Sequence, residues 1–549
     1  MRGGVDQQRD LLDVESIAGH LLPKGSVFAF LAEHRQRLFP ADMFADLFPS
    51  GRGRPSLPPE VAASVIVLQS LHGLSDREAA DAVTFDLRWK AACGYPIDAT
   101  GFHPTTLTYW RRRLAASDRP QRIFDAVREV IVATGVLAGR QRRAVDSTVL
   151  DDAVARQDTV TQLIASIRRV GREVPGGREL ITDRCSRLAG LTGHGYDHVG
   201  KPSISWDDEE ARDRLVTALV NDALVLLDGL DERIGLDKIN ADGGRPAEAV
   251  ALLALVAGQD VEPADGSDGT DGRWQIARKT APDRMISTVD PEARHAHKTQ
   301  HRRQDGFKAH IVIEPETGLT TQVRLTKTSG PDNSDASVGA DLVITDPSIV
   351  QPDVQPDEAD EADERAGGWR VEVLGDSAYA SGPMLAQLQK KGWRPLLKPL
   401  PLRPAIPGGF TIDDFVHDSQ AGSLTCPAGI TRELTRAGNA IFGSACTNCS
   451  LRSRCTTSKI GRTVKINKHD QLHRAHRKRA AGQDFQATYK RHRPMVERSI
   501  AWLTRKNRRV PYRGIEKNNA WLHHRTAGLN LRRLITMGLT VDDRAWALT

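Results

Sequence analysis

The chain is poor in the residues that mark several classes of protein. It has only 6 cysteines among 549 residues, far below the cysteine density of a secreted domain built on disulfides. Its longest apolar run, Ala249 to Ala257, is too short to span a bilayer, and the N-terminus carries charges with no apolar segment after them. We therefore expect a cytoplasmic protein that makes no use of a membrane.

The chain also lacks a strong excess of one charge, since its net charge is only +6. The charges are nevertheless unevenly placed. Acid is concentrated at residues 353–364, which lack apolar periodicity and are expected to form a disordered loop, and base is concentrated at residues 465–513. This asymmetry favours a polyanionic partner such as DNA. The plainer alternative is that each basic run is a solvated face.

Two predicted strands end near an aspartate. Residues 370–379 begin with strand formers and break at Gly375, which presents Asp376 at the strand end. Residues 142–150 form a second short strand, with Asp146 among small and β-branched residues. Because ligands and metals collect at strand ends in α/β sheets, both aspartates are candidate ligands.

A third acid lies on a predicted helix near residues 489–503. There Arg493 and Glu497 are four residues apart and share one face. Two strand aspartates and one helix glutamate can hold two divalent cations, and their hard oxygens suit Mg²⁺ or Mn²⁺. The alternative is that Glu497 is only an ion-pair partner of a nearby arginine.

Two further acids compete for the ligand role. Asp151 and Asp152 directly follow the first aspartate strand. We expect them instead to cap the helix that begins near Asp158, because short acidic side chains are favoured at helix N-termini.

Three motifs together suggest a family. The sequences AVDST with Asp146, VLGDSAY with Asp376, and Tyr489-x3-Arg493-x3-Glu497 resemble the DDE transposases of bacterial insertion sequences. The likeness runs from about residue 50 to the C-terminus and includes a cysteine-bearing insert before the glutamate. It implies an enzyme that cuts double-stranded DNA at element ends and joins the 3′-OH ends to target DNA. Asp146, Asp376 and Glu497 would bind Mg²⁺ or Mn²⁺.

The resemblance also implies an α/β fold. We expect an RNase H-like mixed sheet with helical and cysteine-rich insertions, preceded by an all-helical N-terminal domain. The predicted units are a DNA-binding domain at 1–135, a catalytic core at 136–155 and 273–405, a helical insertion at 156–272, a cysteine-rich insertion at 406–464, and C-terminal core helices at 465–549. Residues 258–272, rich in Asp and Gly, are expected to be a flexible connection. A homodimer on DNA would hold the two element ends, and the protein would lie with the nucleoid.

Basic and aromatic residues supply candidate DNA contacts. The predicted N-terminal helix 105–115 carries consecutive arginines beside aromatic residues, a pattern that can hold phosphates. The basic residues before the predicted hairpin 309–325 could hold a DNA backbone near Asp146, or could protect an exposed edge strand from aggregation. The candidate contacts are Arg111, Arg112, Arg302, Arg303, Lys308, Tyr489 and Arg493.

Four of the six cysteines lie close together in the sequence. Cys426 is followed by Cys446-x2-Cys449-x5-Cys455. In a reducing compartment this grouping favours a structural Zn²⁺ over disulfides, and unliganded thiols are the alternative. Cys93 and Cys185 are expected to be buried packing residues.

Two other functions agree with parts of the pattern. An RNase H-like structure-selective nuclease would cut DNA without joining it, and a DNA-binding regulator would do neither. The three acids in order argue against the regulator.

Overall fold

The structure is a computed structural model that describes residues 1–4, 13–50, 52–198, 200–299, 302–349, 371–505 and 508–549. Its N-terminal part is helical. The elements there are α1 Val14–Ala18, η1 Gly19–Leu21, α2 Val27–Leu38, η2 Ala41–Leu47, α3 Pro59–His72, α4 Asp76–Phe85, α5 Leu87–Cys93, α6 Thr105–Ala115 and α7 Arg122–Ala133.

Local sequence signals explain where two of these helices meet. Helix α3 ends at Gly73, which has the positive φ of 72° that a left-handed C-cap requires. Helix α4 then begins with a capping box, in which the Ser75 side chain accepts from the Glu78 amide and the Glu78 side chain accepts from the Ser75 amide. The predicted helix at 105–115 is confirmed as α6.

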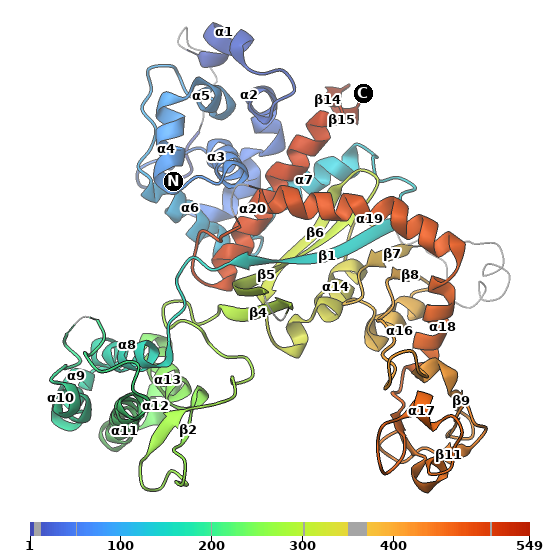
Figure 1. Ribbon diagram of the computed structural model, residues 1–549. Coiled ribbons are helices and arrows are strands. Elements are labelled where there is room, and N and C mark those ends of the chain that lie inside the picture. The colour runs from blue at the N-terminus through green and yellow to red at the C-terminus, as the bar shows by residue number, and fades with distance from the viewer. Residues whose placement is uncertain (5–12, 51, 199, 300–301, 350–370, 506–507) are drawn as a thin grey trace.

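A six-stranded mixed sheet forms the centre of the molecule (Figure 1). Its strand order is β4-β5-β1-β7-β8, and β6 also pairs with β5. Strand β1 is antiparallel to β5 and parallel to β7. This arrangement confirms the expected α/β class and is consistent with an RNase H-like sheet. The strands are β1 Arg142–Asp151, β4 Arg294–Thr299, β5 Arg302–Glu314, β6 Leu319–Lys327, β7 Glu372–Gly375 and β8 Arg394–Leu397.

Helices cover both faces of the sheet (Figure 1). Helices α14 (Asp335–Ile344) and α16 (Gly382–Lys390) lie on one face, and α19 (Gln483–Thr504) and α20 (Ile515–Thr536) lie on the other. Strand β8 lies at the edge of the sheet, where Pro395 is tolerated because it has no amide hydrogen to donate to a further strand. A short 3-10 turn, η3 Pro331–Asn333, precedes α14, and the hairpin of β14 Leu539–Asp542 and β15 Ala545–Leu548 follows α20.

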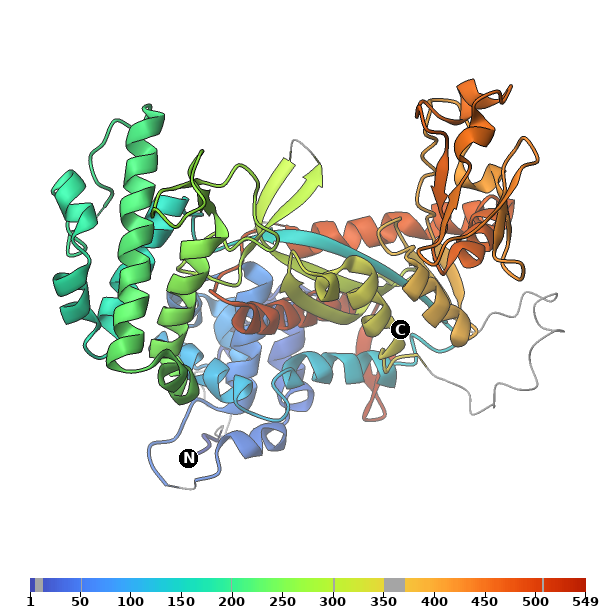
Figure 2. The same ribbon diagram turned by 90° about the horizontal axis from the view of Figure 1, so that it is seen from below.

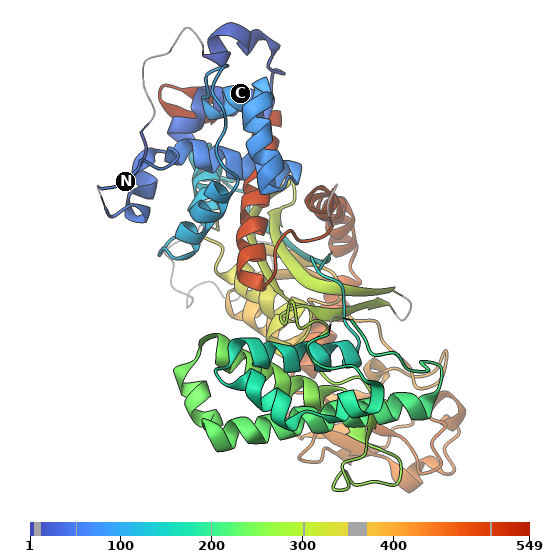
Figure 3. The same ribbon diagram turned by 90° about the vertical axis from the view of Figure 1, so that its left-hand side faces the viewer.

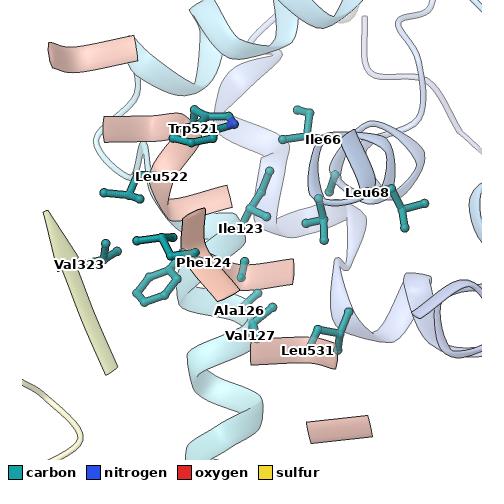
Figure 4. Packing of buried hydrophobic residues seen from close by; sticks show 14 of the residues in the cluster. Ile66, Leu68, Ile123, Phe124, Ala126, Val127, Val323, Trp521, Leu522 and Leu531 are labelled. Carbon is teal, nitrogen blue, oxygen red and sulfur yellow. The ribbon is translucent and has the colours of Figure 1, made fainter. Parts of the chain in front are cut away.

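The N-terminal helices share their apolar core with the sheet. Side chains of α3, α7 and α20 interlock with Val323 of β6 (Figure 4). Helix α20 therefore lies between the N-terminal helices and the sheet. A separate cluster, which includes Val145 and Val373, fills the space between the sheet and α14 and α16.

The helical insertion has a core of its own and lies beyond the end of β1 (Figure 3). Its helices are α8 Thr159–Glu173, α9 Gly177–Arg184, α10 Arg187–Thr192, α11 Glu209–Arg233, α12 Leu236–Asp242 and α13 Gly244–Gln259. The prediction that residues 258–272 form only a flexible connection is wrong. Strand β2 (Val261–Pro263) pairs with β3 (Trp274–Ile276), and the Trp274 amide donates to Thr217 of α11 at 2.9 Å. Tertiary contacts on α11 thus order a segment whose composition is typical of a linker.

The cysteine-rich segment is a small module of short strands at the far end of the molecule from the helical insertion (Figure 2). Arg474 and Arg477 of helix α18 (Asp470–Ala480) pair with Asp413 of the module. These two arginines of the basic stretch 465–513 thus hold the module and are engaged by Asp413. The module contains η5 Ile412–Asp414, β9 Val416–Asp418, β10 Ser423–Thr425, β11 Thr431–Glu433, β12 Asn439–Ile441, η6 Gly443–Cys446, α17 Arg452–Cys455 and β13 Thr463–Lys465.

Two sequence expectations concern membranes and the acidic run. No helix in the described part of the chain is long and apolar enough to cross a membrane. The acidic residues 353–364 lie outside the described residues.

Asp151 and Asp152 do not cap the next helix, contrary to prediction. Asp158 is the N-cap of α8, and its side chain accepts from the Thr161 amide at 2.8 Å. Asp152 is instead buried beside Asp290, where the two side chains are 4% and 1% exposed. Burial, and then the charge of Asp290, raise the pKa of Asp152 to about 6.

This pair predicts a pH-dependent stability. The folded protein keeps the Asp152 proton to a higher pH than the unfolded chain, where the pKa is near the ordinary 3.8. The stabilisation is therefore complete below pH ~4 and is lost as pH rises through about 6, at a cost of at most about 3 kcal/mol. We expect Asp152→Asn to raise the Tm at pH 7.5 but not at pH 4.

The matched control is Asp151→Asn, because Asp151 is the neighbouring acid and is more exposed. Thermal unfolding of both variants across this pH range checks the prediction. An equal Tm change at both pH values for Asp152→Asn would contradict it.

Candidate active site

Strand register brings the two predicted aspartates together. The parallel pairing of β1 with β7 sets Ala144 opposite Leu374. Two residues further along the chain come Asp146, still in β1, and Asp376, just after the end of β7. Since side chains alternate between the faces of a strand, Asp146 projects on the same face as Ala144, toward α19. The negative charge of Asp376 raises the pKa of Asp146, as expected for close neighbours.

The third acid comes from α19. Glu497 lies one helical turn after Arg493 and its side chain is 69% exposed. Pro494 lies between them, inside a helix that begins at Gln483, so it neither starts nor ends the helix. The helix thereby presents one cation and one acid toward the strand end.

Arg493 joins the acids. Its Nη2 donates to Oδ2 of Asp146 at 2.8 Å, and its Nε lies 3.5 Å from Oε1 of Glu497. The other oxygen of Asp146, Oδ1, accepts from the Ser147 amide at 2.8 Å. Asp146 and Glu497, far apart in the sequence, therefore lie against one guanidinium group, and the charge of Asp376 also acts on it.

The electrostatics of this cluster are those of a partly buried ionic site. Burial raises the pKa of Asp146, and Arg493 and the Ser147 amide counteract part of that rise. Burial lowers the pKa of Arg493, but the charges of Asp146, Asp376 and Glu497 outweigh it and the pKa is raised overall. The acids around Arg493 therefore favour its charged form.

Tyr489 forms part of the same site. Its ring stacks on Phe485 with centroids 6.2 Å apart. Burial raises the pKa of Tyr489, and the nearby Arg493 lowers it in part. The phenol thus stays neutral beside the acids.

The acids suit a divalent metal by their chemistry. Carboxylate oxygens are the ligands that Mg²⁺ and Mn²⁺ prefer, and Arg493 already stands among them as a cation. As they are arranged here, no three His, Cys, Asp or Glu side chains in the described residues are grouped so that they could hold a metal ion. The acid side chains would therefore have to move closer together to hold a metal ion.

Lys308 lies on the other face of the sheet. It pairs with Val149 in the register of β1 and β5, three residues from Asp146, and its Nζ donates to Asp335 of α14 at 3.2 Å. Because Val149 comes three positions after Asp146, an odd offset, the side chains of Val149 and Asp146 point to opposite faces, and Lys308 lies on the face of Val149. The expected position of Lys308, holding DNA beside Asp146, does not agree with this geometry.

The polar cluster around Asp335, which Lys308 joins, was not predicted from the sequence. Asp335 also accepts from Ser147 Oγ at 2.6 Å, directly behind Asp146. Tyr379, from the VLGDSAY motif, is fully buried there, and Gly339 of α14 leaves room for its ring. The local sequence signal near Asp335 is Ser334, the N-cap residue of α14. This signal indicates the start of a helix and not a functional site.

The other predicted DNA contacts differ in how exposed their side chains are. Arg111 bonds Asp76 at 2.5 Å and lies over the Tyr512 ring, whereas Arg112 is exposed. Arg302 and Arg303 lie at the start of β5, but their side chains lie outside the described residues.

The four clustered cysteines line one pocket of the cysteine-rich module. Phe410, Phe415 and Phe442 form its apolar wall, and the Arg462 amide lies 3.5 Å from Sγ of Cys446. Burial raises the pKa of Cys455, and the other three cysteines raise it further. Cys93 and Cys185 are buried, as expected for packing residues. The lining cysteines are Cys426, Cys446, Cys449 and Cys455.

Comparison with known proteins gives two family matches. Residues 425–535, which include Glu497, match the family model described as a transposase DDE domain. Residues 18–113 match a transposase domain (DUF772). No curated protein and no solved structure matches the chain. Two transposase matches on one chain, together with a sheet that is consistent with an RNase H-like fold, support the identification of this protein as a DDE transposase of an insertion sequence.

Proposed function

We propose that this transposase cuts DNA at the ends of its element and joins the freed 3′-OH ends to target DNA at Asp146, Asp376 and Glu497. The observation that carries this proposal is that Arg493 contacts both Asp146 and Glu497 and interacts electrostatically with Asp376. In the first step water attacks a phosphodiester bond, and the 3′-oxygen leaves and takes up a proton. In the second step that 3′-OH attacks a target phosphodiester, whose own 3′-oxygen leaves.

The residues of the site have separate roles in this proposal. Asp146, Asp376 and Glu497 would hold two Mg²⁺ or Mn²⁺ ions, which when bound supply Lewis-acid activation of the attacking oxygen and charge neutralisation at the leaving oxygen. Arg493 would bind a non-bridging phosphate oxygen, and Tyr489 would form the wall beside it. Two exposed cations on the same helix, Lys490 and Arg498, would attract the DNA backbone.

The outer parts of the chain would bind and organise DNA. We assign end binding to the helical region 1–135, where Arg112 is exposed on α6. The remaining units would be the helical insertion at 156–272, the cysteine-rich insertion at 406–464, and the catalytic core formed by 136–155, 273–405 and 465–549. A homodimer would bring two element ends together.

A joining assay tests the function. The substrate is DNA from the flank of this coding sequence, pre-cut to leave a 3′-OH, mixed with plasmid, protein and Mg²⁺ or Mn²⁺. We expect plasmid joined to the 3′-OH end. Nicking of uncut flanking DNA without joining would indicate a structure-selective nuclease, and binding without either reaction would indicate a DNA-binding regulator.

We also propose a structural Zn²⁺ at the cysteine pocket. Four thiols in a pocket with an apolar wall are the ligand set that tetrahedral Zn²⁺ prefers, and a backbone amide near Cys446 Sγ would stabilise a thiolate. Zinc would draw the four thiols together. It would then stabilise a module whose apolar core is small.

Elemental analysis of the purified protein checks the zinc proposal. We expect about one zinc per chain, loss of zinc in Cys446→Ser, and a lower Tm after chelation. Cys185→Ser is the matched control, because Cys185 lies in the helical insertion and a serine hydroxyl could still donate to the Asp222 carbonyl. Zinc-free protein with an unchanged Tm in Cys446→Ser would support unliganded thiols.

A further inference from the structure

We propose that Arg493 holds the place of a divalent cation in the DNA-free protein, and that cations bind well at Asp146 only after a DNA phosphate draws the guanidinium away. This inference rests on the proposed function, because it takes the three acids to be the metal site. It adds a property of the DNA-free protein: metal binding and DNA binding are coupled through one side chain.

The guanidinium occupies one of the two ligand oxygens of Asp146. Oδ2 accepts from Arg493 Nη2 at 2.8 Å, and Oδ1 accepts from the Ser147 amide at 2.8 Å. Both oxygens of this carboxylate are therefore engaged. Arg493 also lies 3.5 Å from Glu497 and has an electrostatic interaction with Asp376, so it neutralises the same charges that would attract a metal.

The position of Arg493 is enclosed rather than solvated. Its side chain is only 17% exposed and that of Asp146 only 11%. Within a partly buried site, a guanidinium group and a hydrated divalent cation cannot both lie against Oδ2. Charge repulsion at this short range adds to the steric conflict. Metal binding at Asp146 therefore requires Arg493 to move.

One nitrogen atom of Arg493 has no hydrogen-bond partner among the described residues, and a phosphate oxygen could become that partner. This atom is Nη1, which is buried. Phosphate oxygens form paired hydrogen bonds with guanidinium groups, and these are among the stronger charge-assisted bonds. A DNA phosphate at the site would thus satisfy Nη1, compete for Nη2 and free Oδ2 of Asp146.

Thermodynamic linkage makes the coupling reciprocal. If DNA raises the affinity for Mn²⁺ by some factor, Mn²⁺ raises the affinity for DNA by the same factor. The DNA-free protein would then hold little metal at its cleavage site. The site would become complete mainly on DNA.

Direct measurement of Mn²⁺ binding tests the inference without an activity assay. Electron paramagnetic resonance reports free Mn²⁺ in a titration of the full-length protein in the absence of DNA. We expect Arg493→Ala to bind Mn²⁺ at least about tenfold more tightly than the unchanged protein at the site that Asp146→Asn removes. Arg491→Ala is the matched control, because Arg491 is an exposed arginine on the same helix, and it should leave the affinity nearly unchanged.

A second arm adds a duplex of about 20 base pairs. We expect it to tighten Mn²⁺ binding about tenfold in the unchanged protein and much less in Arg493→Ala. If Arg493→Ala fails to fold by circular dichroism, Arg493→Gln replaces it, since Gln keeps a polar side chain without the charge.

The outcomes separate this inference from the proposed function. Equal Mn²⁺ affinity in the unchanged protein and Arg493→Ala, both lost with Asp146→Asn, would overturn the coupling and leave the metal site intact. No Mn²⁺ binding that depends on Asp146 in any variant, with or without DNA, would overturn both.

Discussion

Replacing Asp376 with Asn is expected to lower DNA strand cleavage by at least about 1,000-fold while leaving DNA binding nearly unchanged. Asp376 follows the last residue of β7, beside Asp146 in the strand register. Asn has nearly the same shape but lacks the negative charge that a divalent cation requires. Binding should survive because the exposed cations of α6 and α19 are untouched.

Cleavage of labelled flanking DNA and a gel-shift titration, run on the same preparation, check this prediction. Asp332→Asn is the matched control, because Asp332 is an exposed acid in the short turn before α14. It should cut at nearly the normal rate. Cleavage retained within tenfold in Asp376→Asn would remove Asp376 from the metal site.

Replacing Asp346 with Ala is expected to destabilise the protein by roughly 3–5 kcal/mol. Asp346 and Arg143 form an ion pair at 3.1 Å with both side chains 0% exposed. The same carboxylate accepts from Thr321 of β6 and from Ser348, so it joins β1, β6 and the end of α14. Its loss would leave the Arg143 charge buried without a counter-ion, on the strand that carries Asp146.

Thermal and chemical unfolding check this second prediction. The matched control is Asp341→Ala on α14, because the ion pair of Asp341 with Arg324 is about half exposed and should contribute less than about 1 kcal/mol. Asp346→Asn should fall between the two, since it keeps the shape but not the charge. A loss below about 1 kcal/mol for Asp346→Ala would mean that solvent reaches Arg143.

Local patterns in the sequence predicted the elements that local physics governs. The helix at 105–115 and the strands that lead to Asp146 and Asp376 follow from side-chain periodicity and backbone preferences. The spacing of Arg493 and Glu497 likewise placed them on one helical face. Each of these features depends on residues within a few positions of one another.

Long-range register decided what the local patterns could not. Lys308 faces Asp335 because of the pairing between β1 and β5, and a shift of one residue would have turned it to the other face. The burial of Asp152 beside Asp290 joins segments more than a hundred residues apart. Neither arrangement can be predicted from the neighbouring residues in the sequence.

The sequence by itself determined which acids this protein carries and which strands and helix present them, because those features are local. Only the tertiary structure decided that the guanidinium of Arg493 lies against Asp146 and that Lys308 does not. The physical reason is that a contact between residues hundreds of positions apart depends on strand register and helix packing, which the whole chain sets together.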